Sequence, residues 1–304
     1  MRVALAHRRL GVPPLKPRLV EKSQGYFEVE PRPSSEELAA YYRDKYFGAN
    51  NGKTSYGHGY TAEELEHKLL QPAETAHVWG KGRGRLLEVG VGEGFTLDYF
   101  LQKGWETTGI DFTDDGVREF FPHLSQHLQV GDAFDLLDAA IARKDSYDLV
   151  ICNNVLEHVI DPLGLLRRLR SLIAPGGLLR ICVPNDGSWL QNQVVSRSMA
   201  PPEFWVAVPD HLNYFNTDSL PRVLDACGWS VVDHLGEFPI DAFLLNPDTN
   251  YLQDRSLGRN CHFARVAFEM GLWRDRSIEA VIEYRRGCAK AGLGRNQTAY
   301  ARPS

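Results

Sequence analysis

The sequence has few cysteines and no long hydrophobic run. Its five cysteines are widely spaced, and no two of them form a C-x-x-C pair. Such spacing suggests neither a zinc knuckle nor a disulfide framework. No apolar run approaches the roughly 18 residues that are needed to cross a bilayer. We therefore expect no membrane span, no structural zinc and no network of disulfides.

A large excess of one charge is also absent. The chain carries 34 basic and 39 acidic side chains, for a net charge of −5, which does not favour binding to nucleic acid. Residues 1–20 are basic, but prolines interrupt them and they lack the apolar core of a secretory signal. The 43% hydrophobic and 24% charged residues are ordinary for a globular protein. We expect a cytoplasmic enzyme, and a homodimer is one option for its assembly.

A glycine-rich segment follows a short apolar run near residue 90. Leu86–Val89 suits a buried parallel strand, and Gly90, Gly92 and Gly94 allow a sharp turn and a close approach to a ligand. Asp111 ends the next expected strand. A carboxylate in that position can accept hydrogen bonds from both hydroxyls of a ribose. The pattern predicts a site for a nucleotide-like cofactor.

The spacing of the glycines separates two classes of cofactor. A dinucleotide-binding turn has the spacing G-x-G-x-x-G, with a helix N-terminus that faces pyrophosphate. Here the spacing is G-x-G-x-G, and Glu88 lies just before the loop. A carboxylate at that place repels a diphosphate and suits a cationic amino-acid group. An NAD-dependent oxidoreductase is therefore disfavoured.

The segment Glu88-x-Gly90-x-Gly92-x-Gly94 resembles the first motif of class I methyltransferases, which use S-adenosylmethionine. Two later stretches resemble the same family. Residues 155–162, Val-Leu-Glu-His-Val-Ile-Asp-Pro, follow an expected strand over 147–153, and a helix expected over 163–173 is closed by Pro-Gly-Gly. The resemblance covers about residues 80–235, and the rest of the chain matches poorly.

This resemblance implies an α/β fold with a seven-stranded, mostly parallel, doubly wound sheet. Residues 296–301 alternate weakly, and we expect them to form an antiparallel strand between the fifth and sixth strands. The implied cofactor is S-adenosylmethionine, with Asp111 on its ribose and Asp132 on its adenine. Asp132 could equally be a turn residue beside Gly131. The residues expected to bind the cofactor are Glu88, Gly90, Gly92, Gly94, Asp111, Phe112, Asp132, Ala133 and Asn153.

We expect three parts along the chain: an N-terminal arm with lid helices (1–80), the cofactor-binding core (81–238), and a C-terminal insertion with the last strand (239–304). Within the third part, residues 239–293 are expected to be irregular and then helical, as an insertion over the carboxyl edge of the sheet. A small strand is expected within 24–31.

Two capped helices are expected in the first part. Ser34 and Thr61 are each followed by a glutamate three residues later, which predicts helices over 36–46 and from residue 61 to about 79. Between them, the glycine-rich loop 48–60 is either a lid or a long connection. An aromatic insertion at 186–210 is expected to close over the acceptor together with this loop.

Two histidines are candidates for catalysis. Transfer to a hydroxyl needs a base that removes a proton, and a neutral imidazole is well suited to this near pH 7. We expect His158 and His211 at the carboxyl edge of the sheet. Alternatively, His158 could only hydrogen-bond locally, and His211 could cap or pack. Glu157 could bind a metal, but no second acid has ligand-like spacing, so we expect none.

We expect methyl transfer to a hydroxyl of a small polar acceptor, a sugar or glycan precursor. Residues 211–217 resemble a segment of sugar and small-metabolite methyltransferases, and the aromatic insertion suits a ring-shaped acceptor. Sugar C-methyltransferases of this general look carry an N-terminal cysteine zinc motif. This chain has no cysteine before Cys152, which favours transfer to oxygen. The alternatives are an N-methyltransferase of a small metabolite and a non-catalytic partner protein that binds S-adenosylmethionine.

Overall fold

The computed structural model describes residues 18–34, 36–38, 41 and 59–304. Residues 48–58 of the expected loop and most of the helix expected over 36–46 lie outside the described residues. No helix in the described ranges is long and apolar enough to cross a membrane.

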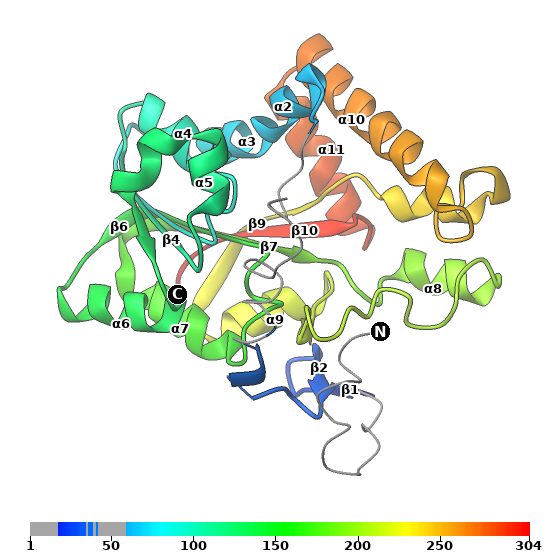
Figure 1. Ribbon diagram of the computed structural model, residues 1–304, viewed down its shortest axis with the longest axis horizontal. Helices are drawn as coiled ribbons and strands as arrows, with labels where there is room; N and C mark the ends of the chain where they lie inside the picture. The colour runs from blue at the N-terminus through cyan, green and yellow to red at the C-terminus, as the bar shows by residue number, and fades with distance from the viewer. Residues whose placement is uncertain (1–17, 35, 39–40, 42–58) are drawn as a thin grey trace.

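A seven-stranded sheet forms the centre of the molecule, in the order β5-β4-β3-β6-β7-β10-β9 (Figure 1). Its parallel strands are β3 (Arg85–Val89), β4 (Glu106–Asp111), β5 (Leu128–Val130), β6 (Tyr147–Asn153) and β7 (Ile173–Pro184). The last strand, β10 (Asn296–Pro303), runs antiparallel between β7 and β9 (Trp229–Gly236). The expected sheet and the place of its last strand are confirmed.

Helices cover both faces of this sheet. One layer consists of α6 (Ala133–Ala142), α7 (Pro162–Leu172) and α9 (Ser219–Ala226). The other contains α3 (Leu70–Trp79), α4 (Phe95–Gln102), α5 (Asp115–Phe120), the 3-10 helix η3 (Pro122–His127) and α11 (Ile278–Lys290). Adjacent strand residues alternate between the layers, so Leu86 packs in one core and Leu87 in the other. The continuous apolar run of β3 follows from burial on both faces.

The helix that begins after Thr61 is shorter than the sequence predicts. Thr61 and Glu64 form the expected capping box at the start of α2 (Ala62–Lys68). The chain then breaks at Leu69 before α3 begins, so one expected helix is two. Pro72 has no backbone N–H to bond the carbonyl of Lys68, four residues earlier, which accounts for the break.

A second, smaller sheet lies beside the main one. It consists of β1 (Arg18–Glu21), β2 (Phe27–Glu30) and β8 (Asn213–Tyr214), in that order and antiparallel. Only β2 falls within a stretch where the sequence predicts a strand. The pairing of β2 with β8 joins the N-terminal hairpin to the segment that follows His211.

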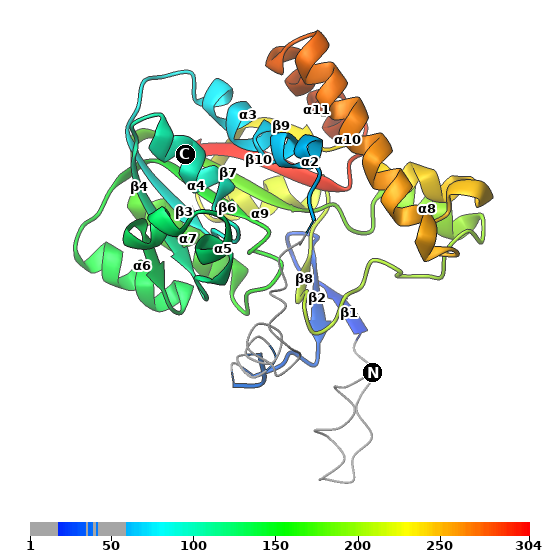
Figure 2. The same cartoon turned by 45° about the horizontal axis from the view of Figure 1, so that its top comes forward.

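The segment 239–293 contains more helix than the sequence suggests. Three short 3-10 helices, η4 (Ile240–Leu245), η5 (Pro247–Thr249) and η6 (Arg255–Leu257), lead into the 18-residue helix α10 (Gly258–Asp275). Figure 2 shows α10 and α11 on the same side of the sheet as α2 and α3. Ile282 of α11 is buried in that helix layer. α11 therefore covers a face of the sheet and not its carboxyl edge, which corrects the expectation for that helix. α10 is joined to α2 by the contacts His67–Glu269 and His262–Glu64.

Candidate active site

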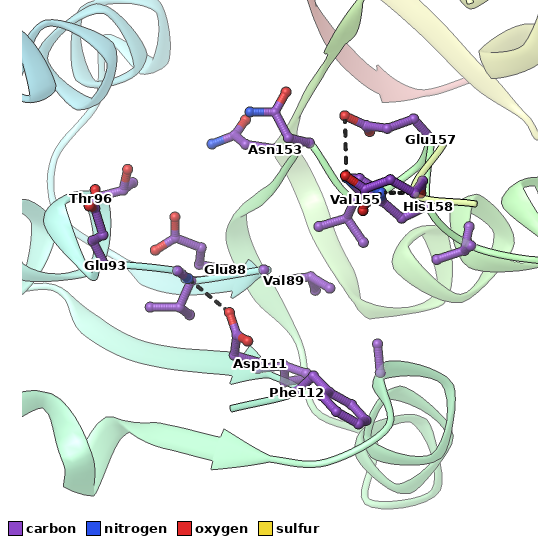
Figure 3. Close-up of a pocket in the computed structure, with 18 of the residues that line it drawn as sticks. Glu88, Val89, Glu93, Thr96, Asp111, Phe112, Asn153, Val155, Glu157 and His158 are labelled. Carbon is purple, nitrogen blue, oxygen red and sulfur yellow. Dashed lines mark hydrogen bonds and ion pairs between the residues drawn. The ribbon is translucent and has the colours of Figure 1, made fainter. Parts of the chain in front are cut away.

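A cavity of about 1090 Å³ opens at the carboxyl ends of β3, β4 and β6. Side chains from these strand ends point into it (Figure 3). All the residues that the sequence singled out for the cofactor and for catalysis line this one cavity: Glu88, Gly90, Gly92, Gly94, Asp111, Phe112, Asp132, Ala133, Asn153, His158 and His211. The fold thus gathers them, although their individual roles stay predictions.

The glycine loop needs glycine for two different reasons. Gly90, Gly92 and Gly94 have φ angles of 81°, 57° and 93°, which side chains other than glycine rarely adopt. A Cβ on Gly90 would also lie 2.3 Å from Cγ2 of Val155. A Cβ on Gly92 would meet nothing within 4 Å, because this residue lines the open cavity. A ligand can therefore reach the backbone there.

Asp111 connects the end of β4 to this loop. Its Oδ2 accepts a hydrogen bond from the Gly92 amide at 2.8 Å, and its Oδ1 accepts one from the Thr113 amide at 3.1 Å. Burial raises the pKa of the Asp111 carboxyl, and the hydrogen bonds from these amides oppose that rise. The carboxylate is held at the cavity wall, where it can accept hydrogen bonds from ribose hydroxyls.

Glu88 is a buried carboxyl beneath the loop. Burial, and then the charge of Asp111, raise its pKa to about 8, while the charge of Arg180 opposes the rise. Its Oε2 has no hydrogen-bond partner among the described residues. A cationic group that enters the cavity beside Glu88 would favour its ionised form. The open face at Gly92 and this unpartnered oxygen both fit the amino-acid end of S-adenosylmethionine.

Asp132 and Phe112 lie at another part of the cavity wall. Oδ1 of Asp132 accepts hydrogen bonds from the amides of Phe134 and Asp135, at 2.8 and 3.2 Å, and so caps α6. Asp132 therefore has a local structural role, as a helix cap rather than only the turn residue beside Gly131 that the sequence also allowed, and it also lines the cavity. The Phe112 side chain is 43% exposed, and an exposed aromatic face can pack on a flat adenine ring.

Sequence reasoning missed a buried arginine behind the cavity. Arg180 of β7 is fully buried and donates a hydrogen bond to Oδ1 of Asn153. It also lies 3.7 Å from Oε1 of Glu74 and donates to the Tyr300 hydroxyl at 3.3 Å. The hydrogen bond from the buried Arg180 therefore fixes the side-chain amide of Asn153 at the cavity wall. One feature of the sequence could have identified this arginine: it is the single charged residue inside the apolar run 178–183.

Three side chains, those of Glu157, His158 and His211, meet in one part of the cavity. The rings of His158 and His211 lie 4.9 Å apart, edge to face, and Nε2 of His158 is 3.9 Å from Oε1 of Glu157. Possible ligand atoms of all three residues lie within 4.8 Å of one another, so they could hold a metal ion. Burial raises the pKa of Glu157 to about 8. That no metal is needed stays a prediction.

The loop that carries His158 is held by hydrogen bonds from distant segments. Nδ1 of His158 lies 2.7 Å from the Asp210 carbonyl oxygen, which assigns the proton to Nδ1 and makes Nε2 the basic nitrogen. Nδ2 of Asn213 donates to the carbonyls of Leu156 and Val159, at 3.0 and 2.8 Å. These bonds orient His158 toward the cavity.

The aromatic insertion differs from its expected place. Within the described residues 186–210, only Asp210 lines the cavity, and Trp189, Phe204 and Trp205 do not. The insertion contains α8 (Trp189–Ser196), and Nε2 of Gln191 in this helix donates to Oδ2 of Asp241 in η4 at 2.9 Å. Its aromatic side chains therefore do not line the cavity in this structure, and closure of the insertion over an acceptor stays a prediction.

Comparisons with known proteins bear on the family of the chain. A family model described as a methyltransferase domain matches residues 57–234. The ubiquinone biosynthesis O-methyltransferase of Haemophilus ducreyi is 31% identical over 127 residues, which are 38% of this chain and 54% of that protein. The enzyme of the same name from Idiomarina loihiensis is 26% identical over 190 residues, or 58% and 76% of the two chains. The chain spans only about half the length of the first of these relatives.

The fold also matches solved structures. The 1,6-didemethyltoxoflavin-N1-methyltransferase of Burkholderia thailandensis, solved with S-adenosylhomocysteine, has a TM-score of 0.50 at 16% identity, covering 95% of this chain and 100% of that one. This likeness shows the fold alone. The family model, however, matches more than half of the chain. This protein therefore belongs to the class I methyltransferases, enzymes that use S-adenosylmethionine.

Proposed function

We propose that this enzyme transfers the methyl group to a hydroxyl of a small polar acceptor. The observation that carries the proposal is that Glu157, His158 and His211 lie together in the same cavity as the residues expected to bind the cofactor. Bound S-adenosylmethionine supplies an electrophilic methyl group on a sulfonium. The protein then has to hold the acceptor oxygen in line, at about 3–3.5 Å from that methyl, and to remove its proton.

The cofactor is proposed to lie along the carboxyl edge of the strands. Its amino-acid end faces the Gly90–Gly94 loop and Glu88, its ribose faces Asp111, and its adenine lies between Phe112 and Asp132. The hydrogen bonds that already hold Asp111 support this placement, because a fixed carboxylate loses little freedom when it binds the ribose.

We propose that His158 or His211 accepts the proton of the acceptor hydroxyl. Support comes from the hydrogen bond between Nδ1 of His158 and the Asp210 carbonyl, which orients the ring and makes Nε2 its basic nitrogen. His211 lies close enough to share the same acceptor, since the two rings are 4.9 Å apart. A positioned base of this kind contributes about 10²–10⁴-fold to the rate.

Two classes of acceptor follow from different observations. A sugar or glycan precursor is proposed from the resemblance of residues 211–217 to sugar and small-metabolite methyltransferases. The names of the curated relatives support a second candidate, an intermediate of ubiquinone biosynthesis. Both candidates receive the methyl group on oxygen.

A methyl-transfer assay tests the proposal. The purified protein would be incubated with S-adenosylmethionine and a panel of hydroxylated sugars, hydroxylated aromatic compounds and matched amines. Formation of S-adenosylhomocysteine and of methylated product would be followed by mass spectrometry. We expect turnover of one or more hydroxylated compounds. Turnover of the amines alone would favour N-methylation, and cofactor binding without turnover of any compound would favour a non-catalytic role.

A further inference from the structure

Besides the two histidines, three basic side chains line the cavity among the residues that the structure describes, and each of them pairs with a carboxylate. Nζ of Lys68 lies 2.7 Å from Oε2 of Glu93. Arg168 binds Asp138 through two nitrogens, at 2.7 and 3.0 Å. The third is Arg295. Among the described residues, its guanidinium donates one hydrogen bond, from Nη1 to Oδ1 of Asp186 at 2.9 Å.

The fold brings Arg295 to the wall of the same cavity. It directly precedes β10, and because β10 runs antiparallel, its first residue, Asn296, pairs with Pro184 at the end of β7. The antiparallel direction thus places the start of this strand at the carboxyl edge of the parallel strands. No parallel strand of the sheet could present its first residues there.

The guanidinium is held in place and is still accessible. Its partner Asp186 is almost fully buried, whereas the Arg295 side chain is 30% exposed and lines the cavity. A guanidinium has five N–H donors in a planar fork, and a second edge can bind both oxygens of an anion. One edge is therefore fixed by Asp186. The side chain also lies in the field of Asp241, and its exposed part faces the cavity, where a ligand can reach it.

Arg295 also lies within electrostatic reach of the groups proposed to handle the acceptor hydroxyl. Burial raises the pKa of Glu157, and the charge of Arg295 is one of the groups that oppose this rise. Glu157 in turn lies 3.9 Å from Nε2 of His158. Arg295 lines the same cavity as His158 and His211, so one bound acceptor could contact the guanidinium and the histidines together.

We infer that the acceptor carries an anionic oxygen group, a carboxylate or a phosphate, that binds Arg295 while its hydroxyl lies at His158 and His211. The inference rests on the proposed transfer to oxygen and narrows its substrate class. Arg295 would then determine specificity, because a charge-assisted bidentate pair favours an anionic acceptor over its neutral counterpart.

The test compares acceptors that differ only in the anionic group. Glucose is paired with glucuronate and with glucose 6-phosphate, and catechol is paired with 3,4-dihydroxybenzoate. For each compound, kcat and KM are measured through S-adenosylhomocysteine formation, and binding is measured by calorimetry with S-adenosylhomocysteine present. The two charged sugars distinguish a carboxylate from a phosphate as the preferred group.

Three variants accompany the wild type. Arg295→Gln removes the charge, and Arg295→Gln combined with Asp186→Asn does so without leaving a buried carboxylate unpaired. The matched control is Arg302→Gln, because Arg302 lies in the same strand and donates to the carbonyls of Gly176 and Gly177 outside the cavity.

We expect kcat/KM to be at least about tenfold higher for the charged member of a pair, and both Arg295 variants to abolish this preference through KM. The control variant should retain this preference.

Equal turnover of charged and neutral compounds by the wild type would overturn the inference and leave the proposed function standing. Binding of an anionic probe that depends on Arg295, without turnover, would support the inference and count against transfer to oxygen. Absence of such binding by every charged probe would overturn the inference.

Discussion

The carboxylate of Asp111 accepts a hydrogen bond from the backbone amide of Gly92 at 2.8 Å, across two neighbouring parallel strands. This bond joins the end of β4 to the loop that follows β3. Because both residues line the cavity, one side chain shapes the glycine loop and also offers a carboxylate to the cofactor. Loss of Asp111 should therefore impair cofactor binding in two ways.

The first prediction concerns Asp111→Ala. Hydrogen bonds to a charged group contribute about 1.5–3 kcal/mol each, so the affinity for S-adenosylmethionine should fall at least about tenfold. Isothermal titration calorimetry measures this directly. As a control, Asp248→Ala removes an exposed carboxylate of η5 that does not line the cavity, and it should leave the affinity unchanged. Unchanged affinity in Asp111→Ala would mean that the ribose is bound elsewhere.

The second prediction distinguishes the two histidines. Replacement of the true base by alanine should lower kcat by about 10²–10⁴-fold and leave cofactor affinity nearly intact. The pH–rate profile of that variant should also lose the limb that an imidazole base produces, around pH 6.5. His123→Ala, which removes a histidine of η3 outside the cavity, serves as the control. If His158→Ala and His211→Ala both keep most of their activity, an amine acceptor becomes the better interpretation.

The third prediction uses the buried Glu88. Burial raises its pKa from 4.5 to about 8 in the folded protein. The folded state therefore holds this proton more tightly than the unfolded state, and the resulting stabilisation is complete below pH 4.5 and is lost as the pH rises to about 8. Glu88→Gln cannot ionise. Its free energy of unfolding, measured with urea and expressed as the difference from wild type, should be larger at pH 8.5 than at pH 5, so the variant gains stability relative to wild type as the pH rises. An equal difference at both pH values would mean that Glu88 does not titrate in this range.

The fourth prediction concerns a buried ion-pair network. Arg285 of α11 joins Glu74 of α3 and Glu269 of α10, at 2.6 and 2.5 Å, and all three side chains are buried. Removal of one partner from a buried pair costs about 3–5 kcal/mol because a charge is left uncompensated. Arg285→Met should therefore lower the free energy of unfolding by that amount.

The matched control for this network is Arg274→Met, because Arg274 forms exposed ion pairs with Glu63 and Glu66. Exposed pairs contribute about 0–1 kcal/mol, so this variant should be nearly neutral. Similar losses in the two variants would show that burial does not set the contribution of the Arg285 pairs.

The fifth prediction addresses the metal. We expect methyl transfer to persist after treatment with EDTA and removal of divalent cations, measured in the same assay as above. The matched sample is enzyme dialysed in parallel without the chelator. Loss of activity that added zinc or magnesium restores would instead make the cluster of Glu157, His158 and His211 a metal site.

Much of the sheet could be predicted from local sequence. Strands such as β3 and β6 are short apolar runs bounded by turn residues, and burial on both faces of a parallel sheet produces that pattern. The capping box at Thr61 is similarly local, because its partners are three residues apart. The glycine loop could be recognised because positive φ angles require glycine at those positions.

The helix α10 shows why other elements were missed. Its buried residues include Glu269, whose charge is balanced by Arg285 and which hydrogen-bonds His67, so the buried face has no continuous apolar stripe. A charged residue is normally interpreted as solvent-exposed. The partners that make its burial tolerable are distant in sequence, and hydrophobic periodicity cannot identify them.

The sequence by itself determined the cofactor loop, the strand that precedes it and Asp111, because each of these depends on residues close together along the chain. Only the folded molecule could bring His211 beside Glu157 and His158, or place Arg295 in the wall of the same cavity. The physical reason is that hydrophobic periodicity records which face of an element is buried. Which strand ends meet is decided by strand order and direction, and these depend on packing between segments far apart in the chain.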